Sequence, residues 1–181
     1  MSELLQYSGE RGVISRFEAD ALLAGIALDS KSFTVNAGVR TFEAASWLRR
    51  SGADMTNVKK YFKIGLDFYQ RKARIVSSAE VLNNGIAVAY TRENDPSMQL
   101  LAAQVADELL EMKGIDTAFV AGRSGNKTMI SARSTGKVNV QTIMERLGGG
   151  GHQTGAAAQI DLGPEEAIAM IVAILREQGQ L

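Results

Sequence analysis

The spacing of apolar residues divides the chain into two parts of different character. Up to about residue 84, apolar side chains recur at helical intervals, which predicts helices and no strands. Beyond that point, short apolar runs alternate with helical stretches, the pattern of an α/β domain. The sequence Asn83-Asn84-Gly85 stops the last helix of the first part, so we place the domain boundary there, with residues 1–84 before it and 85–181 after it.

Several helices are predicted before the boundary. They cover residues 14–28, 41–50, 54–61 and 66–82. The apolar stripe of the first one falls at Phe17, Ala21, Ala24 and Leu28. Ser15, three residues before Glu18, has the spacing of a capping box at its start. Asp29 then opens a polar loop, a place where an aspartate is most often a turn former.

After the boundary, the sequence predicts a mixed central sheet of at least four strands. The predicted strands cover residues 86–90, 117–121, 127–134 and 156–161. Helices are predicted to begin near Asp95-Pro96, Asn139 and Gly163-Pro164. Within 127–134, the period of two places one set of side chains on each face of the sheet. Met129, Ser131 and Arg133 share one face, and Ile130 and Ala132 share the other.

Composition excludes several kinds of chemistry. The 181 residues include 20 basic and 20 acidic side chains, and this balance argues against a protein that wraps duplex nucleic acid. The absence of cysteine excludes disulfides, thiolate metal sites and cysteine nucleophiles, and it suits a cytoplasmic location. The sequence has neither an apolar run of about 18 residues nor the pattern of a signal peptide, so we expect no membrane contact from this chain.

The most unusual stretch is Gly148 to His152, a run of glycines followed by the only histidine of the chain. Because glycine lets a ligand come close to the backbone, we favour a ligand-binding loop, with a helix C-cap and a loose loop as the alternative. The order of elements differs from that of a P-loop, since a helix leads into the glycines and a strand leaves them. The helix end beside Gly148 is the negative end of the dipole. An anion would therefore need backbone amides, His152 and a nearby cation.

Arg133 is the best candidate for that cation. It shares a strand face with Ser131, and the helix over 140–147 returns the chain so that His152 can lie beside that strand. These side chains around a glycine nest could clamp a phosphate, since guanidinium binds phosphate in bidentate fashion. A solvated strand arginine is the alternative. No cluster with metal-ligand spacing and no Gly-x-Ser-x-Gly elbow is present in the sequence.

Two stretches resemble the DHH superfamily of phosphoesterases. Ser131-Ala132-Arg133-Ser134, followed by Gly-Gly-Gly-Gly-His-x-x-x-Ala-Ala-Ala, resembles the signature of the DHH-associated domain, DHHA1. Residues 24–33, followed by Val39-Arg40-Thr41-Phe42-Glu43-Ala44-Ala45, resemble the last signature motif of the DHH catalytic domain. Nearly the whole chain is similar to the C-terminal ends of bacterial membrane-anchored cyclic-di-AMP phosphodiesterases.

The resemblance implies roles for both parts of the chain. Residues 1–84 would be the helical C-terminal part of a DHH domain with a linker helix, and 85–181 a DHHA1 substrate-binding domain. Asp29 matches a metal ligand of a two-manganese centre. The positions that match holders of substrate phosphate and nucleotide are Ser131, Arg133, Gly149, Gly150, Gly151 and His152. The implied ligand is a cyclic dinucleotide or a short oligonucleotide, and the implied reaction is Mn²⁺-dependent phosphodiester hydrolysis.

One departure from the family limits the expected activity. The earlier aspartate motifs and the Asp-His-His sequence are absent from this chain, and a single carboxylate cannot hold two metal ions. We therefore expect a C-terminal fragment that is inactive, or nearly so, on its own and does not bind Mn²⁺ stably. The resemblance places this part in the cytoplasm, on a membrane-anchored protein.

A different class of function is left open. The alternative is a single-stranded nucleic-acid-binding module, or the substrate domain of an exonuclease or oligoribonuclease. The aromatic content of 6% counts against the stacking platforms that such domains use. Homodimerisation is also left open.

Overall fold

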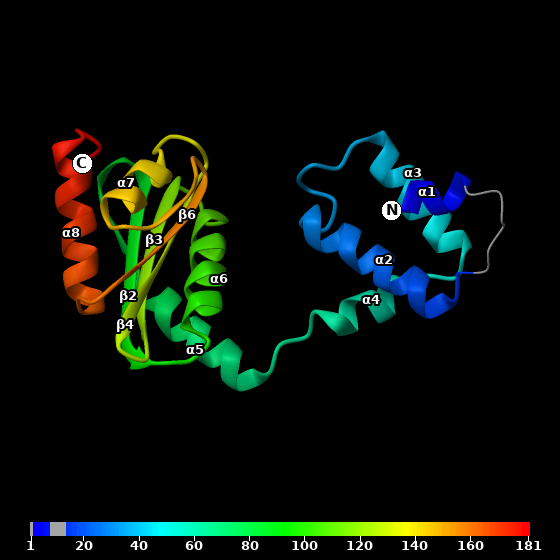
Figure 1. Ribbon diagram of the computed structural model, residues 1–181, viewed down its shortest axis with the longest axis horizontal. Coiled ribbons are helices and arrows are strands. Elements are labelled where there is room, and N and C mark those ends of the chain that lie inside the picture. Colours follow the sequence, from blue (N-terminus) through cyan, green and yellow to red (C-terminus); the bar gives the residue numbers. More distant parts are fainter. Residues whose placement is uncertain (1, 8–13) are drawn as a thin grey trace. The chain divides into compact units, whose positions relative to one another are not determined.

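The computed structural model describes residues 2–7 and 14–181 (Figure 1). The chain forms two compact units, Met1–Gly65 and Leu66–Leu181. No helix among the described residues is long and apolar enough to cross a membrane.

The first unit is helical. Its helices are α1 (Ser2–Tyr7), α2 (Arg16–Asp29), α3 (Val39–Arg50) and α4 (Met55–Tyr61). Leu23, Leu48 and Val58 form its core together with small alanines. The capping box predicted at Ser15 and Glu18 is confirmed. Asp54, at the start of the predicted helix over 54–61, caps α4, and its side chain accepts a hydrogen bond from the Thr56 amide.

The apolar stripe predicted for α2 is wrong. Phe17 and Leu28 are both 68% exposed, and the buried face is Ala19, Asp20, Leu23 and Ala27. The prediction counted only apolar residues, whereas the buried face of α2 includes the carboxylate of Asp20. Asp20 accepts hydrogen bonds from the Asp54 amide at 2.6 Å and from Asn57 Nδ2 at 3.2 Å, so it holds the start of α4 against α2.

The second unit is a six-stranded mixed sheet with helices on both faces, which confirms the predicted α/β class. The strand order is β1-β2-β3-β4-β6-β5, with β2 and β3 parallel and the other neighbours antiparallel. The strands are β1 (Glu80–Val81), β2 (Ile86–Asn94), β3 (Thr117–Ser124), β4 (Lys127–Ser134), β5 (Gly150–His152) and β6 (Gly155–Ile160). The helices are α5 (Leu66–Ser77), α6 (Met98–Leu110), α7 (Val140–Arg146) and α8 (Pro164–Glu177), with a 3₁₀ turn at Asn83–Gly85.

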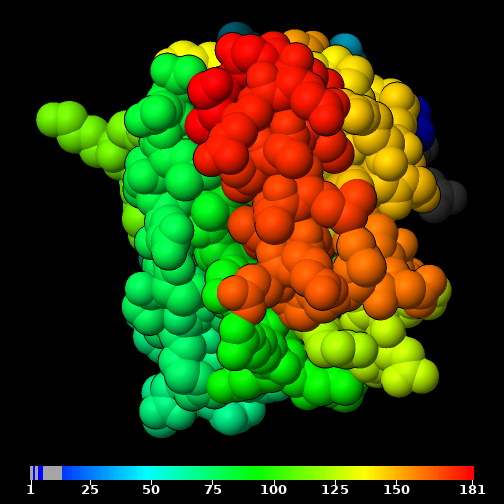
Figure 2. All heavy atoms as spheres, turned by 90° about the vertical axis from the view of Figure 1, so that its left-hand side faces the viewer, coloured from blue at the N-terminus to red at the C-terminus, as the bar shows by residue number. Residues whose placement is uncertain are grey.

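Each face of this sheet has its own core. Helices α7 and α8 pack on one face, through side chains such as Ile143 and Ile171. Figure 2 shows α8 lying across that face. Helix α6 packs on the other face through Leu101 and Val105, and α5 adds Ile75 to the same cluster.

The last helix before the predicted boundary is shorter than expected. It ends at Ser77 because the chain then pairs as β1 with β2, Glu80 opposite Val88 and Val81 opposite Ala87. The compact units divide at Gly65, before α5 rather than after residue 84, because α5 packs with the α6 cluster. The assignment of residues 1–84 to the end of a DHH domain stays a prediction.

Candidate functional site

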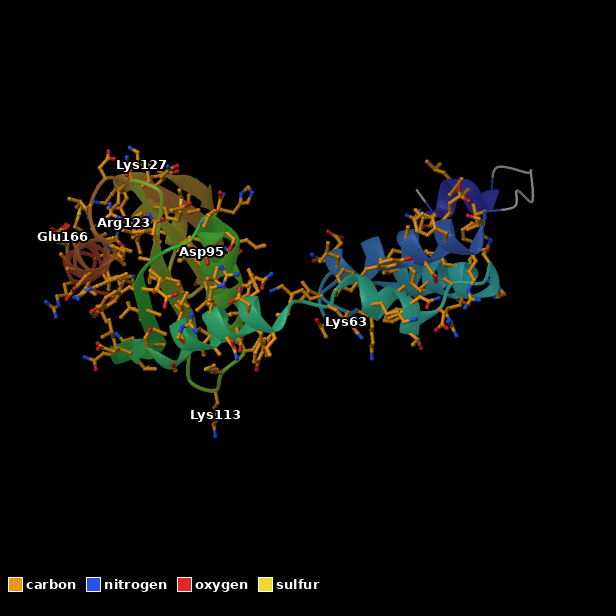
Figure 3. The ribbon with its side chains drawn as sticks, turned by 90° about the horizontal axis from the view of Figure 1, so that it is seen from below. Lys63, Asp95, Lys113, Arg123, Lys127 and Glu166 are labelled. Carbon is orange, nitrogen blue, oxygen red and sulfur yellow. The ribbon has the colours of Figure 1, made fainter. Side chains whose placement is uncertain are left out.

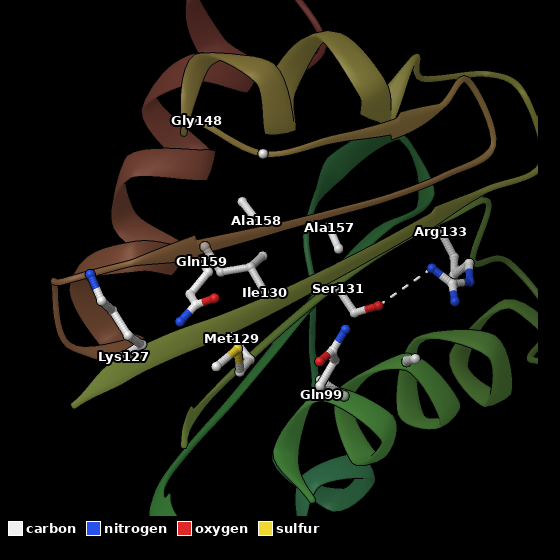
Figure 4. A pocket seen from close by; sticks show the side chains of 13 residues that line it. Gln99, Lys127, Met129, Ile130, Ser131, Arg133, Gly148, Ala157, Ala158 and Gln159 are labelled. Carbon is white, nitrogen blue, oxygen red and sulfur yellow. Dashed lines mark hydrogen bonds between the residues drawn. The ribbon is translucent and has the colours of Figure 1, made fainter. Parts of the chain in front are cut away.

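A pocket of about 670 Å³ lies between α6 and the strands β4 and β6 (Figure 4). Helix α6 contributes Gln99, Ala102 and Ala103 to its lining. The strands contribute Lys127, Met129, Ile130, Ser131, Arg133, Ala157, Ala158 and Gln159, and the turn after α7 contributes Gly148 and Gly149. The pocket therefore brings the predicted Ser131 and Arg133 together with the start of the glycine run.

The alternation along β4 positions the polar side chains, as the period of two predicted. Ile130 and Ala132 are buried in the core under α7 and α8, whereas Met129 packs against the α6 cluster. Ser131 and Arg133, which alternate with that core pair, therefore face α6. Ser131 is only 4% exposed, so its hydroxyl lies at the bottom of the site.

Strand pairing places Arg133 and His152 in one row across the sheet. Arg133 is opposite Gly155 on β6, and Gly155 is opposite His152 on β5. Directly opposed residues of antiparallel strands lie on the same face of the sheet. The side chains of Arg133 and His152 are therefore on either side of Gly155, which has no side chain. Neighbouring strands are about 4.8 Å apart, so the two residues start roughly 10 Å from each other. His152 is thus near the strand of Arg133, with β6 between them.

The floor between these residues is built from small side chains. Ala157 is exposed, whereas its neighbours Ala156 and Ala158 point to the other face and are buried. Ala157 is opposite Gly150 on β5, and α7 packs against β5 and β6 from the far side. On the face toward α6, these parts of β5 and β6 therefore carry only small side chains, which leaves room for a ligand beside Arg133.

The guanidinium of Arg133 already has protein partners. Its Nε donates to Oδ1 of Asp107 on α6 at 3.2 Å, and its Nη1 donates to the Ala132 carbonyl at 3.0 Å. A longer contact of 3.4 Å joins Nη1 to the Ser131 hydroxyl (Figure 4). The side chain is 26% exposed, so it is fixed in place but still open to a ligand. The alternative of a freely solvated strand arginine does not describe it.

The first two glycines of the run end α7. Gly148 has φ of +76°, and its amide donates to the Glu145 carbonyl at 3.0 Å. The Gly149 amide donates to the Met144 carbonyl at 2.8 Å. This is the Schellman arrangement of a helix C-terminus, so the helix-cap reading is correct for Gly148. The predicted anion nest must be corrected here, because these two amides are already used by the helix.

The next glycines differ in the space that surrounds them. A Cβ on Gly149 would lie 2.1 Å from the Ala157 carbonyl oxygen, and one on Gly151 would lie 2.5 Å from the Ala156 Cα. Both positions therefore require glycine for close approach to β6. A Cβ on Gly150 would meet nothing within 4 Å. Among Gly149, Gly150 and Gly151, only Gly150 is a glycine that the packing against β6 does not require.

Sequence reasoning missed the polar residues that α6 and β6 add to the site. On α6 these are Gln99 and Asp107, which lie on one helix face with Ala103 midway between them, since the three are spaced by four residues. Gln159 is brought in by its pairing with Met129. Gly150, Gly151 and His152 lie on β5 and are not part of the pocket lining, and His152 is exposed.

Asp29 lies in the first unit, at the end of α2. It lines a pocket of about 390 Å³ together with Asn36 and Arg40. The three residues that follow Ser30 all have positive φ, with values of 44°, 58° and 69° at Lys31, Ser32 and Phe33. Such a run is strained for residues other than glycine, and strained backbone clusters at active sites, ligand clamps and switch regions.

The donor set around Asp29 does not fit a two-metal centre. Over residues 2–7 and 14–181, no group of three or more histidine and acidic side chains is placed to hold a metal ion. Within the described part, Asp29 is therefore at most one ligand of such a centre.

Comparison with known proteins identifies the family. Residues 83–179 match the DHHA1 domain. The chain is 50% identical over 161 residues to the cyclic-di-AMP phosphodiesterase GdpP of Geobacillus thermodenitrificans, and the match covers 88% of this chain and 24% of that protein. It is 46% identical to GdpP of Bacillus subtilis over 88% of this chain and 25% of that protein. The chain thus spans about a quarter of the length of these relatives.

A solved structure shows the same fold. An exopolyphosphatase-related protein from Bacteroides fragilis superposes with a TM-score of 0.84 at 18% identity, covering 97% of this chain and 54% of that one. The domain match and the relatives together show that the chain belongs to the DHHA1 domain family and is similar to part of the DHH-type cyclic-di-AMP phosphodiesterases.

Proposed function

We propose that this chain supplies the nucleotide- and phosphate-binding part of a Mn²⁺-dependent phosphodiesterase that hydrolyses cyclic-di-AMP. The observation that carries the proposal is that Arg133 and His152 lie on either side of Gly155, on a part of the sheet with small side chains beside the α6 pocket. The proteins that match most of this chain are named cyclic-di-AMP phosphodiesterases, which supports the choice of substrate. The proposal places the chain in the cytoplasm, as part of a membrane-anchored enzyme.

The binding role follows from the charges and donors at the site. Arg133 can give a charge-assisted hydrogen bond to a phosphate oxygen while Asp107 keeps its Nε fixed. The buried Ser131 hydroxyl adds a neutral donor next to it. A phosphate above Gly155 would lie between Arg133 and His152, because Gly155 has no side chain in the way. The contribution of the glycine run is then Gly150 and the edge strand rather than a nest at Gly148.

No catalytic step is assigned to this chain, because its described residues do not form a metal site. We propose Asp29 as one ligand of the Mn²⁺ centre. The remaining ligands would have to come from outside the described residues.

Direct binding tests the proposal. We expect the 181-residue chain to bind cyclic-di-AMP or its linear product pApA in a calorimetric titration, more tightly than a single-stranded oligonucleotide with no adenine. Equal affinity for any single strand would favour a nucleic-acid-binding module instead. Absence of binding to either adenine dinucleotide would contradict the proposal.

A further inference from the structure

The α6 pocket has a second end, away from Arg133, with different chemistry. Met129 precedes Ser131 and Arg133 on the same face of β4, so it lies about 7 Å and about 13 Å from them along the strand. Gln159 is opposite Met129 on β6, and Gln99 reaches the pocket from α6. The end defined by Met129, Gln99 and Gln159 is therefore within the reach of one nucleotide whose phosphate is at Arg133.

The two carboxamides at this end are exposed to solvent. Neither Gln99 nor Gln159 makes a side-chain hydrogen bond within the described part of the chain, and both line the pocket. Figure 4 shows them extending into the pocket on either side of Met129. Met129 is half-buried against the α6 cluster, so it presents a soft apolar surface between two groups that can each donate and accept.

On the edge of the base that carries N7, this combination favours adenine over guanine. A glutamine carboxamide pairs in bidentate fashion with the donor and acceptor on the N6/N7 edge of adenine, whereas the O6/N7 edge of guanine offers two acceptors and suits arginine or lysine. Lys127 is the cation that lines this end, and its ammonium group is paired with Asp161 at 2.6 Å. The N7 edge of guanine would therefore have to compete with Asp161 for this cation.

We propose that Met129, Gln99 and Gln159 form an adenine subsite, with the base against Met129 and its N6/N7 edge bound by the carboxamides. The subsite rests on the proposed function, because it takes the phosphate of the same nucleotide to be at Arg133. It makes the two glutamines the residues that determine base specificity.

The test uses ligands that share a phosphate and differ in the base. The whole chain, labelled with ¹⁵N, is titrated with AMP, GMP and ribose 5-phosphate, and side-chain amide shifts are followed by NMR. The variants are Gln99→Leu and Gln159→Leu, with Gln178→Leu, exposed at the end of α8, as the matched control. Thermal unfolding confirms that each variant is folded.

We expect the wild type to bind AMP at least about tenfold more tightly than GMP or ribose 5-phosphate. Each pocket variant should lose about fivefold to a hundredfold in AMP affinity, the effect of one bidentate contact, with ribose 5-phosphate unchanged. Equal binding of the three ligands by the wild type, or equal losses for AMP and ribose 5-phosphate, would overturn the subsite and leave the phosphate site standing. Failure of the wild type to bind any of them would overturn the proposed function and the subsite with it.

Discussion

Asp107 on α6 holds Arg133 on β4, with Oδ1 of the carboxylate 3.2 Å from Nε of the guanidinium. The contact joins the helix and the strand that form opposite walls of the pocket. It fixes the arginine in place, but it also puts a negative charge beside the expected position of a phosphate. Orientation and repulsion therefore act in opposite directions at this pair.

Replacing Asp107 by asparagine separates the two effects. Asparagine keeps an acceptor for Nε and removes the charge, so we expect Asp107→Asn to bind pApA about twofold to tenfold more tightly at low salt. The gain should shrink as sodium chloride is raised, because salt screens charges that are partly open to solvent. Calorimetric titration at two salt concentrations measures both effects. Weaker binding by Asp107→Asn would mean that the carboxylate charge itself is needed to orient Arg133.

Neighbouring glycines should respond differently to the same added methyl group. Gly149→Ala would place a Cβ against the Ala157 carbonyl, so we expect a loss of about 1–3 kcal/mol in the free energy of unfolding. Gly150→Ala has open space and should change stability by less than about 0.5 kcal/mol. Urea denaturation of the two variants gives both values.

A larger side chain at Gly150 tests contact with the ligand. We expect Gly150→Val to fold and to bind pApA more weakly than the wild type, because the added methyl groups would obstruct close approach to β5. Unchanged affinity in a folded Gly150→Val would show that no ligand approaches this part of the glycine run.

Asp95, which follows β2 and is labelled in Figure 3, should make stability depend on pH in the acid range. The hydrogen bond from the Ser97 hydroxyl is the largest cause that lowers the pKa of its carboxyl, and the Ser97 amide and the ion pair with Arg71 lower it further. Burial raises this pKa but is outweighed by the other effects together. The folded state therefore favours the charged form. Its stabilisation is complete above the unfolded pKa of about 3.9 and is lost as pH falls through the lower folded pKa.

The comparison with Asp95→Asn isolates this carboxyl. We expect the variant to be less stable than the wild type by about 1–3 kcal/mol at pH 7, and the difference to shrink below about pH 4. Denaturant unfolding between pH 3 and pH 7 measures it. A difference that stays constant over this range would mean that Asp95 does not titrate differently in the folded state.

The chain alone should not turn over cyclic-di-AMP with Mn²⁺. The reason is that the described residues offer Asp29 but no cluster of metal ligands. Chromatographic analysis of long incubations gives the rate, with Asp29→Asn as the control for contaminating phosphodiesterase. Turnover by the wild type that Asp29→Asn abolishes would show that the chain holds a working metal centre.

Features with a local signal could be predicted from the sequence. The capping box at Ser15, the cap at Asn139 and the two faces of the β4 strand are each set by residues a few positions apart. The alternation along β4 was enough to place Ser131 and Arg133 on one face. Their surroundings depend on α6, which packs on this face of the sheet, and on β6, which pairs with β4.

Other features depend on contacts that the sequence does not reveal. Strand β1 has only Glu80 and Val81, too short for any period, and is formed by pairing with β2. Strand β5 consists of Gly150, Gly151 and His152, and glycine has no preference for strands, so pairing with β6 creates it. The buried face of α2 was misjudged because Asp20 belongs to it.

The most direct test of the phosphate site is the affinity of Arg133→Ala for pApA, measured by calorimetry beside Arg123→Ala. Arg123 lies near the C-terminal end of β3, whereas Arg133 on β4 is opposite Ala118 near the start of β3. Arg123 is outside the α6 pocket and is labelled in Figure 3. A charge-assisted hydrogen bond contributes about 1.5–3 kcal/mol, so Arg133→Ala should bind about tenfold to a hundredfold more weakly while Arg123→Ala binds like the wild type. Equal affinity of the wild type and a folded Arg133→Ala would contradict the account, because the phosphate would then have to bind elsewhere.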